Sequence, residues 1–314
     1  MQHAFPITLL RRVVVLLIAC ALSFGGARQS AAPAASTRTV SLYATVGTDG
    51  KLVTGLTANN FRLYEDGKPR EFRLDECETP ITIALLLEYG ETSGLYWSDL
   101  QNAAWGFHQA VPEGNWYALA TFSDSVKIEQ DFTKVKGKIL SAFGGLYEPT
   151  WGTLRTYDAI YEMLDKMDRL PGRRVLIFVG SGMNEFGSRR LEDVQEKVEQ
   201  GNVSVYSIGA GSWLRGSYEP YLTDWDRMDL LQAEAFLRTL SARSGGEAWF
   251  PLFEMAFQDV MRGIMQSLEN QYHIVYESPI PPDEKFHNIR LEAFQIVEDQ
   301  RKDFRVRVRE GWRF

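Results

Sequence analysis

The sequence predicts an α/β fold: a doubly wound, mainly parallel sheet, accompanied by N- and C-terminal β arms that form a small β-sandwich-like domain. Three observations predict it. Residues 81–87 and 175–179 are nearly continuously apolar, as strands buried on both faces require. Segments with helical spacing separate such strands, which is the order of a parallel sheet with crossover helices. Toward both ends of the chain, apolar and polar residues alternate instead, as in half-buried strands.

The composition is that of a folded, acidic protein. The 314 residues include 45% hydrophobic and 24% charged side chains, which is enough apolar surface for a sizeable core. Lys and Arg number 34 and Asp and Glu number 41, so the net charge is -7. A net acidic chain lacks the basic footprint of proteins that bind nucleic acids or anionic membranes. We therefore expect neither kind of partner.

Residues 1–27 have the features of a signal peptide. Arg11 and Arg12 supply the positive end, residues 13–24 are apolar, and small residues suited to cleavage precede residue 28. We therefore expect an exported protein, which is periplasmic, envelope-associated or secreted. An apolar run of about 12 residues is shorter than the roughly 20 that span a bilayer, so we expect no transmembrane span in the mature chain.

The two cysteines have separate expected fates. Cys20 ends a stretch that resembles a bacterial lipobox, so a lipid anchor at Cys20 remains an alternative to cleavage after Ala27. In either case Cys77 lacks a partner for an internal disulfide. We expect Cys77 to be a half-buried apolar filler rather than a reactive thiol.

The first part of the mature chain combines a linker with short strands. Residues 28–39 are rich in Ala, Ser, Thr and Pro, which is typical of a flexible linker. The N-terminal β arm, residues 38–78, contains the hairpin-type turns Asp49-Gly50 and Asp66-Gly67 between strand-like pieces. This segment is expected to be a small β unit.

Residues 80–271 are expected to form the α/β domain, in which strands and helices alternate. Strands are predicted at 81–87, 116–122, 126–132, 175–179, 203–208 and 248–250. Helices are predicted near 98–111, 154–164, 191–201, 231–242 and 257–268, the first of them capped by Ser98 or Asp99. Residues 211–229 are predicted to be a long loop.

The C-terminal β arm, residues 272–314, returns to alternation without a helical segment. Such strands cannot join a parallel sheet through normal crossovers. Each β arm has only about 40 residues, too few for a stable domain without disulfides. We therefore expect the two arms to pair with each other around the inserted α/β domain, and we expect Trp312 and Phe314 to close their shared core.

Several short segments of the mature chain follow one another in an order typical of one family. They include Val53-Thr54-Gly55-Leu56-Thr57, the segment 61–69, Leu85-Leu86-Leu87-Glu88, Ala120-Thr121-Phe122-Ser123-Asp124, Gly152-Thr153, Tyr157-Asp158-Ala159, Gly172-Arg173-Arg174 and Val205-Tyr206-Ser207-Ile208-Gly209. Together they resemble the von Willebrand factor type A (VWA) domain, particularly the bacterial VWFA-related family of exported proteins. The resemblance implies a Rossmann-like sheet whose partner-binding loops lie at the carboxyl ends of the strands. In metal-binding members, these loops build a metal-ion-dependent adhesion site from an Asp-x-Ser-x-Ser run, a Thr and a later Asp.

The metal site that the resemblance implies is degenerate in this sequence. Glu88 stands where the family has Asp, Gly90 replaces the first Ser, and Ser181 replaces the later Asp; Thr92 and Thr153 keep hydroxyl groups. Too few oxygen ligands remain for Mg²⁺, which demands near-octahedral geometry. We therefore expect no cofactor and no tight metal site. A weak, irregular Mg²⁺ site that combines the remaining oxygens with Glu91 stays open as an alternative.

The same loops are rich in aromatic residues. Trp and Tyr are typical anchors of protein interfaces because they supply large contact areas at low entropic cost. The alternative is that about half of them pack the loops against the domain. The expected partner-binding residues are Tyr89, Trp97, Trp151, Trp213, Tyr218 and Trp225, and Tyr96, Tyr147 and Tyr221 lie in the same loops.

The sequence thus predicts a non-enzymatic, exported binding or adhesion module that recognises a protein in the cell envelope or outside the cell. One alternative is an Mg²⁺-dependent adhesion domain that coordinates an acidic residue of its partner. Another is an exported hydrolase that uses Ser181, or the pair Glu88 and Glu91. The histidines of the mature chain are not predicted to lie beside Ser181; they are His108, His273 and His287.

Overall fold

The computed structural model describes residues 37–149, 151–252 and 256–314. The chain divides into two units, Met1–Ala35 and Ser36–Phe314. The predicted signal peptide, Cys20 and most of the predicted linker lie outside the described residues. Within the described part, no helix has the length and apolar character needed to cross a membrane.

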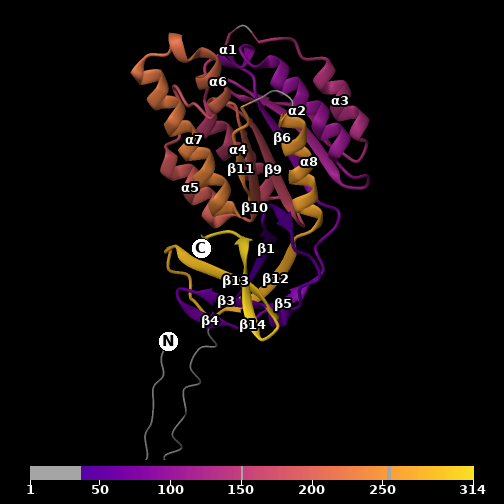
Figure 1. Cartoon of the computed structure of the whole chain (residues 1–314). Helices are drawn as coiled ribbons and strands as arrows, with labels where there is room; N and C mark the ends of the chain where they lie inside the picture. The colour runs from indigo at the N-terminus through magenta and orange to yellow at the C-terminus, as the bar shows by residue number, and fades with distance from the viewer. Residues whose placement is uncertain (1–36, 150, 253–255) are drawn as a thin grey trace, which may run out of the picture. The chain divides into compact units, whose positions relative to one another are not determined.

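The α/β part of the second unit contains a six-stranded sheet (Figure 1). The strand order is β11-β10-β9-β6-β7-β8, and every neighbouring pair is parallel except β7 and β8. The mainly parallel sheet is therefore observed, with one antiparallel strand at its edge. The bounds are β6 Thr82–Glu88, β7 Trp116–Phe122, β8 Val126–Thr133, β9 Arg174–Gly180, β10 Val203–Gly209 and β11 Ala248–Trp249.

Helices cover both faces of this sheet. Alternate residues of β6 point to opposite faces, so Ile83 and Leu85 join one apolar cluster whereas Ala84 and Leu86 join another. The first cluster includes side chains of α2, α3, α6 and α8, and the second includes side chains of α4, α5 and the C-terminal half of α7. The helices are α1 Glu91–Gly94, α2 Trp97–Ala110, α3 Lys136–Gly144, α4 Thr156–Asp168, α5 Leu191–Gln200, α6 Gly211–Tyr218, α7 Asp224–Ser244 and α8 Ala256–Glu269.

The helix predictions need three corrections. α1 and α3 were not predicted, and α2 begins at Trp97, so neither Ser98 nor Asp99 is its N-cap. The predicted loop 211–229 is largely helical, since it contains α6, the short 3-10 helix η2 Glu219–Tyr221 and the start of α7. A capping box starts α7: Asp226 N donates to Thr223 Oγ1 and Thr223 N donates to the Asp226 carboxylate. That Thr-x-x-Asp pattern is visible in the sequence and could have located the helix.

The two β arms pair with each other in a second, nine-stranded sheet. Its main path is β4-β3-β13-β14-β1-β12-β5, β2 and β15 pair at its sides, and all of these pairings are antiparallel. The N-terminal strands are β1 Arg38–Thr48, β2 Lys51–Leu52, β3 Phe61–Glu65, β4 Lys68–Arg70 and β5 Arg73–Asp75, with the 3-10 helix η1 Ala58–Asn60 before β3. The C-terminal strands are β12 Tyr272–Ser278, β13 His287–Val297, β14 Gln300–Arg307 and β15 Gly311–Trp312.

The expected sandwich of two packed sheets is not confirmed, because these strands form one hydrogen-bonded path. The reason lies in the two long strands, which change partners along their length. β1 pairs with β12 through residues 38–44 and with β14 through residues 45–47. β13 pairs in turn with β15, β3 and β14. A strand that changes partners in this way carries the sheet around its own apolar core.

The core of this second sheet contains a buried polar cluster around Glu65. Tyr276 Oη donates to Glu65 Oε1 at 2.6 Å, and the indole nitrogen of Trp312 donates to the same oxygen at 3.1 Å. Arg70 forms an ion pair with the other carboxylate oxygen. Trp312 is buried and packs edge-on against Phe314. The end of the chain thus lies in the core that both arms share.

Cys77 follows β5 and is half buried. Its thiol donates to the carbonyl oxygen of Gln271 at 3.1 Å. Burial raises the pKa of the Cys77 thiol, and the nearby Arg173 acts against this. A raised pKa lowers the thiolate fraction, so the environment fits the expected filler rather than a reactive thiol.

His287 forms a pH-sensitive contact between the arms. Its Nδ1 lies 2.8 Å from Asp66 Oδ2 and its Nε2 lies 2.9 Å from Asp283 Oδ1. Burial disfavours the charged ring, but the hydrogen bonds and charges of the two aspartates outweigh this and raise the pKa of His287. Lys285 faces Asp283, and Trp312 packs against the ring.

We expect His287→Gln to destabilise the protein more at pH 6 than at pH 9. The folded-state pKa of His287 is above its unfolded value of about 6.5, so its contribution is fully present below that pH and is lost as pH rises through the folded-state value. Urea unfolding of both proteins at the two pH values measures the difference. An equal loss at both pH values would contradict a charged His287.

Candidate functional site

Two of the predicted metal-ligand positions, Glu88 and Ser181, belong to a buried polar cluster. Glu88 ends β6, Ser181 follows β9, and Tyr96 precedes α2; all three are buried. Ser181 donates to Glu88 Oε2 through its backbone nitrogen at 2.8 Å and through its hydroxyl at 2.7 Å. The Tyr96 hydroxyl donates to Glu88 Oε1. The Glu88 carboxylate thus accepts hydrogen bonds from Ser181, which stands at another of the predicted metal-ligand positions.

The buried cluster shifts the pKa values of both Glu88 and Tyr96. Burial raises the pKa of Glu88, and the hydrogen bonds from Tyr96 and Ser181 act against that rise. Burial also raises the pKa of Tyr96 well above its usual value, and the neighbouring Glu88 adds to that effect. Tyr96 therefore stays protonated and acts as a donor.

Gly90, a third predicted metal-ligand position, has no space for a side chain. A Cβ atom at Gly90 would lie 2.7 Å from Leu154 Cδ2 and 3.0 Å from the carbonyl oxygen of Gly152. Leu154 is fully buried, so the space for a ligating side chain is occupied by apolar atoms. The packing of the loop before α4 therefore leaves no room for a side chain at Gly90.

We expect Gly90→Ser to destabilise the protein by about 2 kcal/mol, because the added atoms must displace Leu154 from a packed position. Gly137→Ser is the matched control, since a Cβ atom there meets nothing within 4 Å. Urea unfolding measures both changes. Equal stability of the two variants would show that the loop yields without cost.

The remaining predicted metal positions do not join the buried cluster. The Thr153 hydroxyl donates to the carboxylate of Asp124 in the loop after β7. Thr92 lies half exposed on α1, and Glu91 is exposed at the start of that helix. In the described part of the chain, no group of three or more His, Cys, Asp or Glu side chains is arranged to hold a metal ion.

The predicted partner-binding aromatics fall into two groups. Trp97, Trp213 and Tyr218 are half buried and pack against the core cluster on one face of the sheet. Trp97 stacks on Phe143, and Tyr89 contacts Trp97 edge-on while its hydroxyl donates to the carbonyl oxygen of Tyr147. These side chains therefore pack against the core or against neighbouring rings.

The second group is exposed. Trp151 is 77% exposed and Trp225 is 80% exposed, and Tyr147 and Tyr221 are also highly exposed. Further exposed apolar residues, which the sequence pattern did not indicate, lie in segments that follow the carboxyl ends of β6, β9 and β10: Leu95, Phe186, Met228 and Leu231. In a sequence, such apolar residues cannot be told from core residues. Only their exposure in the folded structure distinguishes them.

Ser181 does not have the surroundings of a catalytic serine. It is fully buried and its hydroxyl is bonded to Glu88. The three histidines, which were not predicted to lie beside Ser181, contact other groups. His108 packs against Trp105, His273 Nε2 lies 2.6 Å from Ser41 Oγ, and His287 hydrogen-bonds Asp66 and Asp283. Glu91 is exposed and Glu88 is buried, so the two carboxylates do not face one solvent-accessible site, as an acid and base pair would.

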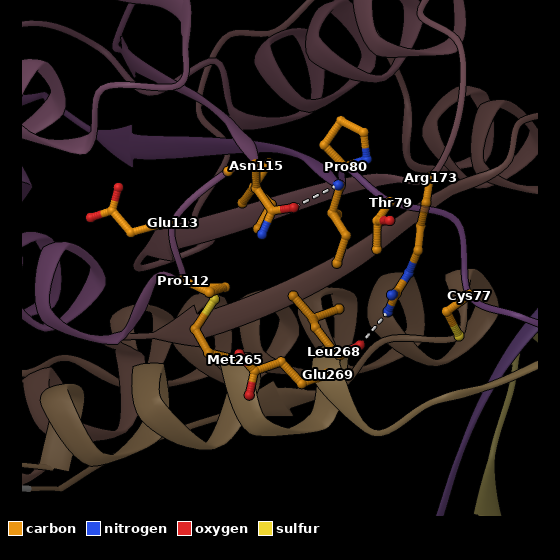
Figure 2. A pocket seen from close by; sticks show the side chains of 13 residues that line it. Cys77, Thr79, Pro80, Pro112, Glu113, Asn115, Arg173, Met265, Leu268 and Glu269 are labelled. Atoms are coloured by element: carbon orange, nitrogen blue, oxygen red, sulfur yellow. Dashed lines mark hydrogen bonds between the residues drawn. The ribbon is translucent and has the colours of Figure 1, made fainter.

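One pocket lies away from this cluster; Cys77, at the end of the N-terminal β arm, lines it together with residues of the α/β part (Figure 2). It has a volume of about 500 Å³, and Pro80, Pro112, Met265 and Leu268 supply apolar walls. Arg173 points toward the end of α8, where it donates to the Leu268 carbonyl oxygen at 2.9 Å. This bond satisfies a C-terminal carbonyl of α8, so Arg173 has a structural role here.

No protein-family model and no curated protein matches this chain. Solved structures do match it. A von Willebrand factor type A protein from Catenulispora acidiphila is 10% identical with a TM-score of 0.47, covering 88% of this chain and 75% of that one. An aerotolerance-related membrane protein from Bacteroides fragilis is 12% identical with a TM-score of 0.46, covering 60% and 99%.

A further solved structure that matches is proximal thread matrix protein 1 from the mussel byssus, with a zinc-occupied MIDAS motif. It is 11% identical with a TM-score of 0.45, covering 61% of this chain and 48% of that one. The matches include VWA proteins, the class of fold that the sequence segments resemble. At such identities and TM-scores, the likeness gives no information on function.

Proposed function

We propose that this chain is an exported VWA-like module for protein binding or adhesion, with a degenerate metal site and with exposed aromatic side chains as its recognition surface. One observation carries the proposal. Glu88, at the first predicted metal-ligand position, is buried and hydrogen-bonded to Ser181, whereas Trp151 and Trp225 are largely exposed. Trp151 precedes Gly152, whose carbonyl oxygen accepts from Glu91 N just after β6, and Trp225 lies in the segment after β10. Recognition through aromatic contacts fits that arrangement better than recognition through a coordinated cation.

A melting experiment tests the metal part of the proposal. We expect Mg²⁺, Mn²⁺ and EDTA to change the melting temperature by less than about 1 °C, because the proposal includes no tight metal site. A metal ion that bound only the native state would raise the melting temperature. A Mg²⁺-dependent rise that Thr153→Ala abolishes would instead support the Mg²⁺-dependent adhesion domain. Labelling of Ser181 by a fluorophosphonate probe would support the hydrolase.

A binding experiment tests the recognition part. Purified full-length chain is incubated with an envelope extract of the cells that produce it, and bound proteins are recovered. We expect Trp151→Ala combined with Trp225→Ala to weaken recovery about tenfold or more, as loss of aromatic anchors does. Trp116→Ala is the matched control, because Trp116 is exposed at the opposite, amino-terminal end of β7. Unchanged recovery with the double variant would contradict the proposal.

A further inference from the structure

Helix α7 carries apolar side chains on two opposite faces. Leu230, Ala233 and Leu237 are buried on the face toward the domain. At 100° per residue, Trp225, Met228 and Leu231 lie on the other side of the helix, and they are 80%, 51% and 49% exposed. A surface helix of a globular protein normally has one apolar face, so the outer face of α7 is not explained by the packing of this domain.

We call Tyr221, Trp225, Met228 and Leu231 the α7 ridge. Its backbone is held in place at the N-terminal end of the helix. Thr223 caps the helix, and Arg227 forms ion pairs with Glu219 and Asp224. Arg227 also donates to the carbonyl oxygen of Glu219, which joins η2 to α7. The backbone that carries the ridge is therefore already helical before binding, which lowers the entropic cost of docking it.

The ridge is flanked by acidic side chains. Residues 216–232 contain four acids, Glu219, Asp224, Asp226 and Asp229, and one base, Arg227, so their net charge is 1 − 4 = −3. The Asp224 side chain is fully exposed. An acidic border of this kind repels anionic lipid surfaces and a second copy of the same ridge, and it attracts basic side chains.

We infer that the α7 ridge docks as a helix into an apolar groove of a partner protein whose rim carries Lys or Arg side chains. This inference rests on the proposed function and specifies the surface and the partner for it. Apolar helix residues about one turn apart are the usual anchors of such a groove, and Trp225 is the largest of them. The acids guide the approach and set the orientation, because charge pairs at a rim act mainly on association and specificity.

Site-specific photo-crosslinking of the full-length chain tests the inference. A photoreactive amino acid replaces Met228 in one protein and Trp151 in another, and each is irradiated in the envelope extract at about 50 and 300 mM salt. We expect the Met228 position to crosslink a protein, with yield about tenfold lower in Trp225→Ala. Asp224→Asn with Asp229→Asn should reduce the yield about threefold and remove its salt dependence. Glu192→Gln with Glu196→Gln, on the exposed side of α5, is the matched charge control and should leave the yield unchanged.

Three results would overturn the inference. The first is a crosslink that ignores salt and the aspartate substitutions. The second is Trp225-dependent binding to vesicles of phosphatidylglycerol and phosphatidylcholine, and the third is a Trp225-dependent dimer in sedimentation. A crosslink from position 151 without one from position 228 would overturn the ridge but leave the proposed function standing. No crosslink from either position would contradict both.

Discussion

Replacing Glu88 with alanine is expected to destabilise the protein by about 4 kcal/mol. The substitution leaves a cavity beside buried apolar residues and removes the acceptor for the Ser181 and Tyr96 hydroxyls and for the Ser181 amide. Each buried donor that loses its partner costs about 1 to 3 kcal/mol. Urea unfolding of the full-length chain measures the change.

Two further variants separate the causes of this loss. Glu88→Gln keeps an oxygen acceptor and nearly the same volume, so we expect a loss of about 1 kcal/mol or less at acidic pH. Glu91→Ala removes a nearby exposed carboxylate and should change stability by less than about 0.5 kcal/mol. A Glu88→Ala protein as stable as Glu91→Ala would mean that the buried cluster does not support the fold.

The pH dependence of Glu88→Gln has a definite sign. The pKa of Glu88 is raised in the folded state, so the folded protein holds this proton more tightly than the unfolded chain does. Its contribution to stability is therefore largest below the unfolded value near 4.5 and falls as pH rises through the folded-state pKa. Gln does not titrate, so the stability advantage of Glu88 over Gln should shrink as pH increases. An advantage that grows with pH would contradict a raised pKa.

Arg309→Leu is expected to destabilise the protein by about 4 kcal/mol. Arg309 follows β14 and is buried; it donates to the carbonyl oxygens of Gly201 and Glu199 at 2.9 Å and of Gly311 at 2.7 Å. Two of these carbonyls lie at the C-terminal end of α5, where helix carbonyls have no intrahelical partner. Burial lowers the pKa of Arg309 to about 10, which still leaves it charged at neutral pH. Leucine would leave these buried carbonyls without their donor.

Arg305→Leu is the control, because Arg305 is exposed on β14; we expect a change below about 0.5 kcal/mol. Arg309→Lys should show an intermediate loss, since an ammonium group cannot reproduce the fork of guanidinium donors. Because Arg309 joins β14 to α5, we also expect the Arg309→Leu protein to unfold over a broader urea range than the parent. Similar stability of Arg309→Leu and Arg305→Leu would contradict this role.

The sequence predicted those elements whose apolar pattern is local. The continuously apolar residues 81–87 and 175–179 become β6 and β9, with helices on both sides, because a strand buried on both faces has no polar positions. The arms were recognised by their period of two, and the absence of a helix between the C-terminal strands indicated antiparallel pairing. The start of α7 was missed, because its exposed apolar residues weaken the amphipathic pattern that marks a surface helix.

The substituted ligand positions alone predict a degenerate metal site, but they do not show which contacts these residues make in the folded chain. The Glu88 contact with Ser181 joins residues 93 positions apart, and the closure of the Gly90 position depends on Leu154 in another loop. Likewise, Trp97 and Trp225 are the same kind of residue, yet one packs on Phe143 and the other is exposed. Local patterns depend on neighbours along the chain, whereas burial, hydrogen-bond partners and exposure depend on contacts between distant segments, and these exist only once the chain has folded.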